Sequence, residues 1–91
     1  MNTAKKYELY KKFLKTKPIL VVPVNWPGWN LHCIKMNYNI DGKNLTLNAC
    51  IDKEASFSYS ANITNEKNKV IAKFHNPFYA KELYEHGQKY L

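Results

Sequence analysis

The sequence predicts a two-layer α+β domain, in which one antiparallel meander sheet of four to five strands carries an N-terminal and a C-terminal helix on one face. Three observations predict it. Apolar residues follow a helical period at both ends of the chain, they alternate with polar residues between positions 32 and 74, and an Asp-Gly turn interrupts the alternation at positions 41 and 42. With 91 residues, 45% of them hydrophobic, the chain is expected to form a single α+β domain over residues 1–91.

A first helix is predicted from residue 3 to about residue 15. Its apolar side chains fall on one stripe at a helical period, at Tyr7, Leu9, Tyr10, Phe13 and Leu14. The opposite face is cationic and carries Lys5, Lys11, Lys12 and Lys15. Because the residue before a proline favours an extended conformation, the helix is expected to end ahead of Pro18.

The strands follow from a period of two. Residues 19–24 are predicted to form a strand at the edge of the sheet, because Pro23 has no N–H to donate to a neighbouring strand. Residues 32–40 place apolar side chains at the even positions. A two-residue turn at Asp41 and Gly42 would pair residue 40 with residue 43, so that the odd positions of residues 45–51 continue the same apolar face.

Two further strands and a helix complete the predicted domain. Residues 57–63 and 70–74 alternate like the preceding strands, and we expect residue 64 to pair with residue 69 across a turn at residues 65–68. That register would place Val70, Ala72 and Phe74 on the apolar face. The last helix is expected to have Asn76 as its N-cap and Pro77 as its first helical residue.

The charge is strongly positive and unevenly distributed. Fourteen lysines, no arginine and seven acidic residues give a net charge of +7, and six of those lysines lie within the first 17 residues beside Glu8 alone. Lysine is a flexible point charge, whereas bidentate recognition of phosphate uses the planar guanidinium of arginine. The composition therefore favours general attraction of polyanions over the reading of bases.

The two cysteines are expected to be reduced thiols that pack as small hydrophobic side chains, with a cross-strand disulfide between Cys33 and Cys50 as the alternative. The predicted hairpin register sets them directly opposite each other. No metal site and no cofactor are predicted, because no cluster of His, Cys and carboxylate residues has metal-ligand spacing. No apolar run has the length of a membrane span, so we expect a cytoplasmic protein without a membrane partner.

Three surfaces are candidates for binding. Trp26 and Trp29 flank Pro27-Gly28, and we expect one indole to close the core and the other to contact a partner. Leu20, Val22 and Val24 would form an apolar patch on the outer side of the sheet, of the kind that marks a partner or dimer surface. The rest of that side is polar, with Lys35 and Lys73 among its asparagine, serine and threonine residues.

An enzymatic alternative rests on Ser58 and His75. The predicted register places them opposite each other on the polar face, with Asn48 nearby, which suggests a nucleophile, a base and an orienting group. A flat sheet supplies no oxyanion hole, so we expect no catalytic activity and treat a small hydrolase as a minor alternative. His32 is expected to be buried in the core.

The function predicted from these features is that of a small non-catalytic binding module, which occupies or blocks a surface of a protein that handles nucleic acid. In size and format the chain is similar to phage-encoded inhibitors of bacterial defence systems, anti-CRISPR proteins among them. The alternative is direct, sequence-independent binding of nucleic acid through the lysine-rich first helix. A homodimer is a further alternative for the apolar patch.

Overall fold

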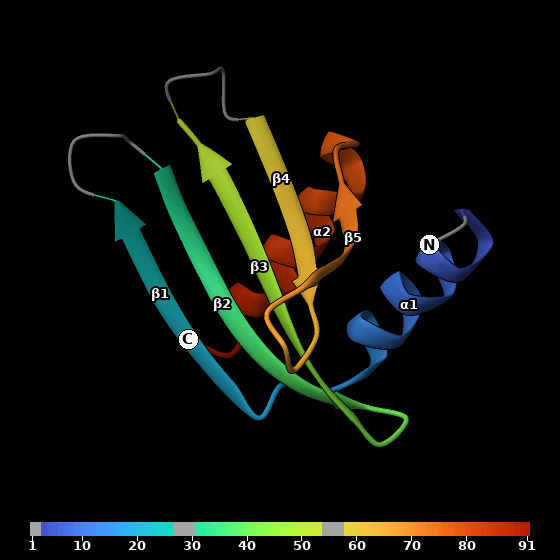
Figure 1. Cartoon of the computed structure of the whole chain (residues 1–91). Coiled ribbons are helices and arrows are strands. Elements are labelled where there is room, and N and C mark those ends of the chain that lie inside the picture. The colour runs from blue at the N-terminus through green and yellow to red at the C-terminus, as the bar shows by residue number, and fades with distance from the viewer. Residues whose placement is uncertain (1–2, 27–30, 54–57) are drawn as a thin grey trace.

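The computed structural model describes residues 3–26, 31–53 and 58–91, without the side chains of Thr3 and Trp26. The chain runs in the order α1 (Thr3–Lys15), β1 (Leu20–Trp26), β2 (Leu31–Ile40), β3 (Lys43–Asp52), β4 (Ser58–Thr64), β5 (Val70–Phe74) and α2 (Pro77–Gln88). The five strands form one antiparallel sheet in the order β1-β2-β3-β4-β5, which confirms the predicted meander (Figure 1).

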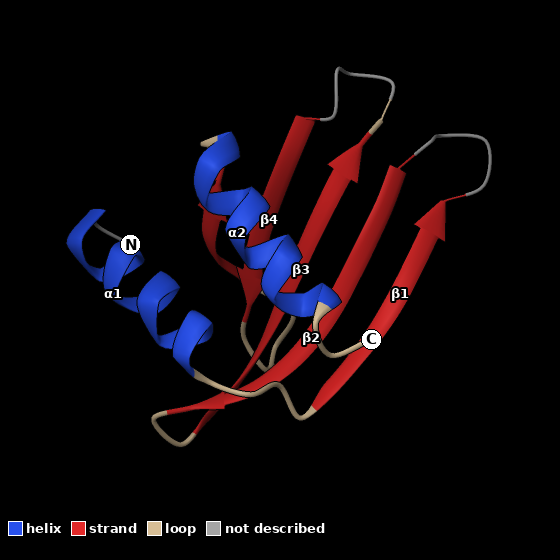
Figure 2. Cartoon of the chain, turned by 180° about the vertical axis from the view of Figure 1, so that it is seen from behind, coloured by secondary structure: helices blue, strands red, loops and turns tan. Residues whose placement is uncertain are grey.

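Both helices lie on one face of this sheet, so the predicted two-layer α+β architecture is confirmed. α2 crosses the middle strands, and α1 lies beside α2 on the side of β5 (Figures 1 and 2). The core fills the space between the two layers, and its fully buried side chains include Phe13, Met36, Leu47, Ile63 and Leu83.

Aromatic side chains and one hydrogen bond hold α1 against the sheet and against α2. The Phe13 ring packs edge-on against the Tyr38 ring with 4.5 Å between centroids, and the Tyr10 ring packs similarly against Tyr79 at 5.1 Å. The Tyr10 hydroxyl also donates a hydrogen bond to the Glu82 carboxylate of α2. Burial, and then this hydrogen bond, raise the pKa of Tyr10 well above its usual range, so the phenol stays a donor.

The N-terminus of α2 forms as predicted. Asn76 is the N-cap, its side-chain oxygen accepts a hydrogen bond from the Phe78 amide at 2.9 Å, and Pro77 opens the helix. This cap satisfies one of the amide groups that a helix start leaves without an internal partner.

The β2–β3 hairpin has the predicted turn and register. Asp41 and Gly42 have φ angles of 53° and 80°, the two positive values that a type I′ turn requires, and Ile40 pairs with Lys43. The register then continues through the pair of Cys33 and Cys50.

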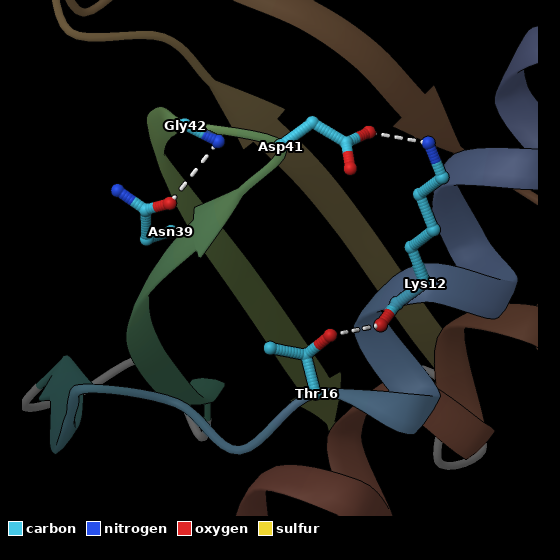
Figure 3. Close-up of polar contacts among 5 residues, drawn as sticks. All are labelled: Lys12, Thr16, Asn39, Asp41 and Gly42. Carbon is cyan, nitrogen blue, oxygen red and sulfur yellow. Dashed lines mark hydrogen bonds and ion pairs between the residues drawn. The ribbon is translucent and has the colours of Figure 1, made fainter.

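The tip of this hairpin is tied to the C-terminal end of α1 (Figure 3). Lys12 of α1 forms an ion pair with Asp41, and the Gly42 amide donates a hydrogen bond to the Asn39 side chain at 3.2 Å. The Thr16 hydroxyl donates to the Lys12 carbonyl oxygen at 2.6 Å, where α1 ends. Lys12, one of the lysines of the predicted cationic face, therefore has a partner within the chain. The hydrogen bond to Asp41, and then the negative charge of Asp41, raise the pKa of Lys12.

The loop between β4 and β5 differs from the predicted one. The Asn65 amide donates to the Lys69 carbonyl oxygen at 3.0 Å, the Asn68 amide donates to the Asn65 carbonyl oxygen at 3.0 Å, and Asn68 has a φ of 61°. This is a three-residue loop closed by Asn65 and Lys69, with a residue in the left-handed region after a turn. The expected pairing of residue 64 with residue 69 is therefore wrong.

A β-bulge shifts the same pair of strands once more. Thr64 pairs with Val70 but Ile63 pairs with Ala72, so Ile71 is the extra residue. Ile71 packs against the core and Val70 is exposed. The prediction that Val70 faces the core is wrong, whereas Ala72 is buried as expected.

Gly87 allows α2 to lie close to the sheet. A Cβ atom at this position would lie 2.6 Å from Met36 Sδ and 3.2 Å from Ile34 Cγ2. Met36 is fully buried, and its sulfur accepts a hydrogen bond from the Tyr38 hydroxyl at 3.5 Å, so the side chain has little room to move away.

We expect Gly87→Ala to lower the free energy of unfolding by about 1 kcal/mol, although alanine is the better helix former. Overpacking a core costs about 1 to 3 kcal/mol, which outweighs the gain of about 1 kcal/mol from replacing glycine in a helix. Chemical denaturation followed by circular dichroism measures the difference. Combining Gly87→Ala with Met36→Val should relieve much of the loss, and a more stable single variant would contradict the close approach of α2 to Met36.

Candidate functional site

The outer face of the sheet is the face that neither helix covers. In Figure 1 the sheet stands in front of α2, in Figure 2 α2 stands in front of the sheet, and α1 lies to one side in both views. The antiparallel registers place Leu20, Val22 and Val24 of β1 beside Asn37, Lys35 and Cys33 of β2 on this outer face. The predicted position of Leu20, Val22 and Val24 on the outer side of the sheet is thus confirmed.

One end of the outer face is apolar. We call this the apolar patch, and it consists of Leu20, Val22, Val24, Leu31, Cys33 and Cys50. Leu20 is 52% exposed and Val22 is 39% exposed, although both lie within a strand. Ile19, directly before β1, is 69% exposed and borders a shallow recess with Asn37 and Thr46. Ile19 is not among the predicted binding residues, because its neighbours in this recess lie on β2 and β3 and in the β4–β5 loop.

A disulfide joins Cys33 and Cys50 within the apolar patch, so the expectation of two reduced thiols is wrong. The two residues are direct partners in the β2–β3 register, and their Cα atoms lie 4.0 Å apart. That short separation is typical of a non-hydrogen-bonded antiparallel pair, where side chains come closest. The bridge therefore follows from the hairpin register, whereas the expectation of reduced thiols followed from the predicted cytoplasmic location.

The rest of the outer face is a network of amides and hydroxyls. The Asn48 side chain donates to Asn62 at 3.2 Å across β3 and β4, and the Thr46 hydroxyl donates to Asn37 at 3.1 Å. Lys35 and Lys73 are both exposed, and they lie in the same row of paired residues as Asn48 and Asn62. The polar groups largely satisfy one another, which leaves the lysines as the charged features of this row.

The lysines of α1 do not belong to the same site as the apolar patch. Lys5, Lys11, Lys12 and Lys15 are exposed on α1, on the helix side of the molecule, and α1 lies beyond the β5 side of the sheet while β1 is the opposite edge (Figures 1 and 2). The predicted binding residues described by the structure thus divide between two surfaces.

The tryptophan positions lie largely outside what the structure describes. Trp26 pairs with Leu31 at the end of β1, but its side chain is not described, and Trp29 lies within residues 27–30, outside the described residues. The expected core plug and partner contact of the two indoles stay predictions.

The predicted opposition of Ser58 and His75 is wrong, because the loop and the bulge move β5 by two positions relative to β4. Phe74 pairs with Ala61, Ser58 pairs with Asp52 of β3, and His75 follows the end of β5. The described residues therefore do not bring this serine and this histidine together as a nucleophile and a base.

His32 is half-buried, so its predicted place in the core is wrong. β2 begins beyond the part of the sheet that α2 crosses (Figure 2), and the His32 Nδ1 atom lies 2.9 Å from the Asn25 side-chain oxygen. Among the described residues there is no group of three or more His, Cys, Asp or Glu side chains that could hold a metal ion. Neither described helix has the length and apolar character needed to cross a membrane.

Comparisons with models of protein families, with curated proteins and with solved structures give no match for this chain. The functional argument therefore rests on the surfaces described above.

Proposed function

We propose that this chain is a non-catalytic binding module that occupies a surface of a protein that handles nucleic acid, and that it docks through the apolar patch. The observation that carries the proposal is the exposure of Leu20 and Val22 on a sheet face that neither helix covers. Contiguous exposed apolar side chains with a polar surround are typical of protein interaction sites.

The composition of the surround supports a protein partner with acidic side chains around an apolar centre. The chain has a net charge of +7, and Lys35 lies directly beside Val22 in the register. Like charge on a second copy would oppose a homodimer, whereas an acidic rim on another protein would favour encounter. Inhibitors of bacterial defence systems encoded by phages, anti-CRISPR proteins among them, provide a format of the same size for such a module.

Direct binding of nucleic acid through α1 is the second candidate. The observation that favours it is the exposed cationic face with Lys11 and Lys15, to which Lys12 contributes less because it pairs with Asp41. Contacts with phosphate release counterions, so this binding would weaken steeply as the salt concentration rises.

The proposed place of action is the cytoplasm, where cellular thiols keep most cysteines reduced. The apolar patch does not depend on the state of the disulfide, because the turn at Asp41 and Gly42 sets the register of β2 and β3. Docking is therefore proposed for the bridged and for the reduced chain.

One pair of variants separates the two candidates. We expect Val22→Lys to weaken capture of a protein partner from lysate at least tenfold, because it places a charge at the centre of an apolar interface, and to leave retention on nucleic acid unchanged or stronger. Lys11→Gln combined with Lys15→Gln should weaken retention on nucleic acid and leave capture of the protein partner unchanged.

The measurement is a pull-down from lysate with and without nuclease, with Asn62→Lys as the matched control on the polar part of the outer face. Capture that survives nuclease and is lost only with Val22→Lys supports the proposal. Capture that nuclease abolishes, or that Val22→Lys leaves unchanged, contradicts it.

A further inference from the structure

A groove runs along the free edge of β5, away from the apolar patch. β5 is the last strand of the sheet, so among residues 3–26, 31–53 and 58–91 one of its sides has no strand partner. A shallow, open recess of about 490 Å³ lies along this strand, and Lys6 of α1 is among the residues that line it. Its lining residues are Lys6, Val70, Ile71, Ala72, Lys73 and His75.

The main chain of Lys73 faces this free edge. The Cα separation of 4.0 Å marks Cys33 and Cys50 as a non-hydrogen-bonded pair. Hydrogen-bonded and non-hydrogen-bonded pairs alternate along each pair of neighbouring strands, and a residue directs its N–H and C=O to only one of its two neighbours. Applied from β2 across β3 and β4 to β5, these two rules make Ala61 and Phe74 a hydrogen-bonded pair. Lys73, the next residue, then directs its N–H and C=O to the unpaired side of β5.

A smaller recess lies at the end of the groove. It has a volume of about 100 Å³ and is lined by Lys6, Tyr7, Phe74, Asn76 and Tyr79. The Tyr7 and Tyr79 rings pack edge-on at 5.0 Å, and the Lys6 ammonium lies 4.9 Å from the centroid of the Phe74 ring. An apolar cavity of about 150 Å³ holds a benzene ring, so a recess of this size and lining suits one aliphatic side chain.

The charges along the groove select the occupant. Lys6 and Lys73 line the two recesses together with His75, and no acidic residue of the described part of the chain lines either one. A lysine and a bulge on a short edge strand oppose pairing with a second copy of the same strand. An acidic extended segment would meet neither obstacle, since its carboxylates pair with the lysines.

The other edge of the sheet is less suited to adding a strand. By the same alternation, Val24 forms a hydrogen-bonded pair with Cys33, so the neighbouring residue Pro23 faces solvent. Proline has no N–H, and the outer edge of β1 therefore lacks a donor at its centre.

We propose that the free edge of β5 binds an extended acidic peptide segment of another protein by strand addition, in the groove between β5 and α1. The segment forms main-chain hydrogen bonds with Lys73, its carboxylates pair with Lys6 and Lys73, and one of its apolar side chains fills the recess beside Tyr7 and Tyr79. Main-chain bonds supply affinity in such complexes, and the recess supplies specificity. This surface is separate from the apolar patch, so the two proposals stand or fall independently.

The test is a selection from a displayed library of random linear peptides of about ten residues, long enough for a strand of ordinary length. The full chain is the bait, and a Lys6→Glu, Lys73→Glu double variant, checked for folding by circular dichroism, is the counter-bait. We expect enriched peptides that are acidic, with an apolar residue at a fixed position. Their affinity should fall at least tenfold for the double variant and should be unchanged for the control Lys17→Glu, an exposed lysine between α1 and β1.

Two measurements on an enriched peptide then identify the binding mode. In NMR titrations of the labelled chain, the amide shifts should concentrate on residues 70–75 and on the helix residues beside the recess. A peptide methylated at alternate main-chain nitrogens should bind at least tenfold more weakly in one methylation register than in the other, since only one register removes the bonds to Lys73. Raising the ionic strength from about 0.1 M to about 1 M, which shortens the screening length from about 10 Å to about 3 Å, should weaken binding.

Three outcomes would overturn the inference. They are a library without enrichment over the double variant, enriched peptides without acidic residues, and methylated peptides that bind equally in both registers. Peptides whose amide shifts map to residues 20–24 would overturn it as well, and would instead support docking at the apolar patch.

Discussion

Replacing Phe13 by alanine is expected to lower the free energy of unfolding by about 3 to 5 kcal/mol, a large part of the 5 to 15 kcal/mol that stabilises a typical domain. The Phe13 side chain is fully buried and packs edge-on against Tyr38, so its removal leaves a cavity between α1 and the sheet. Alanine is the better helix former, so the loss would come from packing alone. Urea denaturation followed by circular dichroism measures it.

The chain offers a matched control for this substitution. Phe78 lies in α2 and is 63% exposed, so Phe78→Ala is expected to change the free energy of unfolding by less than about 1 kcal/mol. Similar losses at the two positions would contradict the placement of Phe13 in the core.

Removing the disulfide is expected to lower the free energy of unfolding by about 3 kcal/mol. Cys33 and Cys50 are 17 residues apart in the sequence, and closing a loop of that length limits the conformations of the unfolded chain by about that amount. For a domain of this size, each kcal/mol lowers the melting temperature by about 4 to 8 °C. The measurement compares thermal unfolding of the chain with and without a phosphine reductant.

The double variant Cys33→Ala, Cys50→Ala controls for effects of the reductant itself. It should melt near the temperature of the reduced chain and should not respond to reductant, and its amide spectrum should retain the β2–β3 pairing. A melting temperature of the unmodified chain that does not change on reduction, although titration confirms two free thiols, would contradict the bridge.

The sequence predicted the parts of the fold whose signals are local. The Asp41-Gly42 turn has residues suited to positive φ angles, and its two-residue length leaves one register for all of β2 and β3. Asn76 and Pro77 likewise fix the start of α2 through groups within three residues of each other.

The β4–β5 pairing could not be predicted in the same way. Asn68 adopts a left-handed conformation, which asparagine tolerates but does not require, and it closes a three-residue loop between Asn65 and Lys69 where the sequence predicted a four-residue turn. The bulge depends on whether Val70 or Ile71 packs against the core, and that is a property of the assembled layers. Asn68 is the residue whose type favours the left-handed position, and therefore the shorter loop.

The candidate surfaces also contain residues that a local pattern predicts and residues that only the assembled fold brings together. Period-two alternation placed Leu20, Val22 and Val24 on the outer face, because β1 pairs with β2 in a regular register. Lys6, His75 and Ile19 were not selected, because the surfaces to which they belong are formed by segments distant in the sequence.

Because both helices pack on the same side of the sheet, side chains that face the core and side chains that face outward alternate along each strand, as Leu47 and Asn48 show at adjacent positions of β3. A replacement at Asn48 or Val22 removes no contact beneath α2. Over evolutionary time, descendants of this chain can therefore change the outer face while inheriting the same framework.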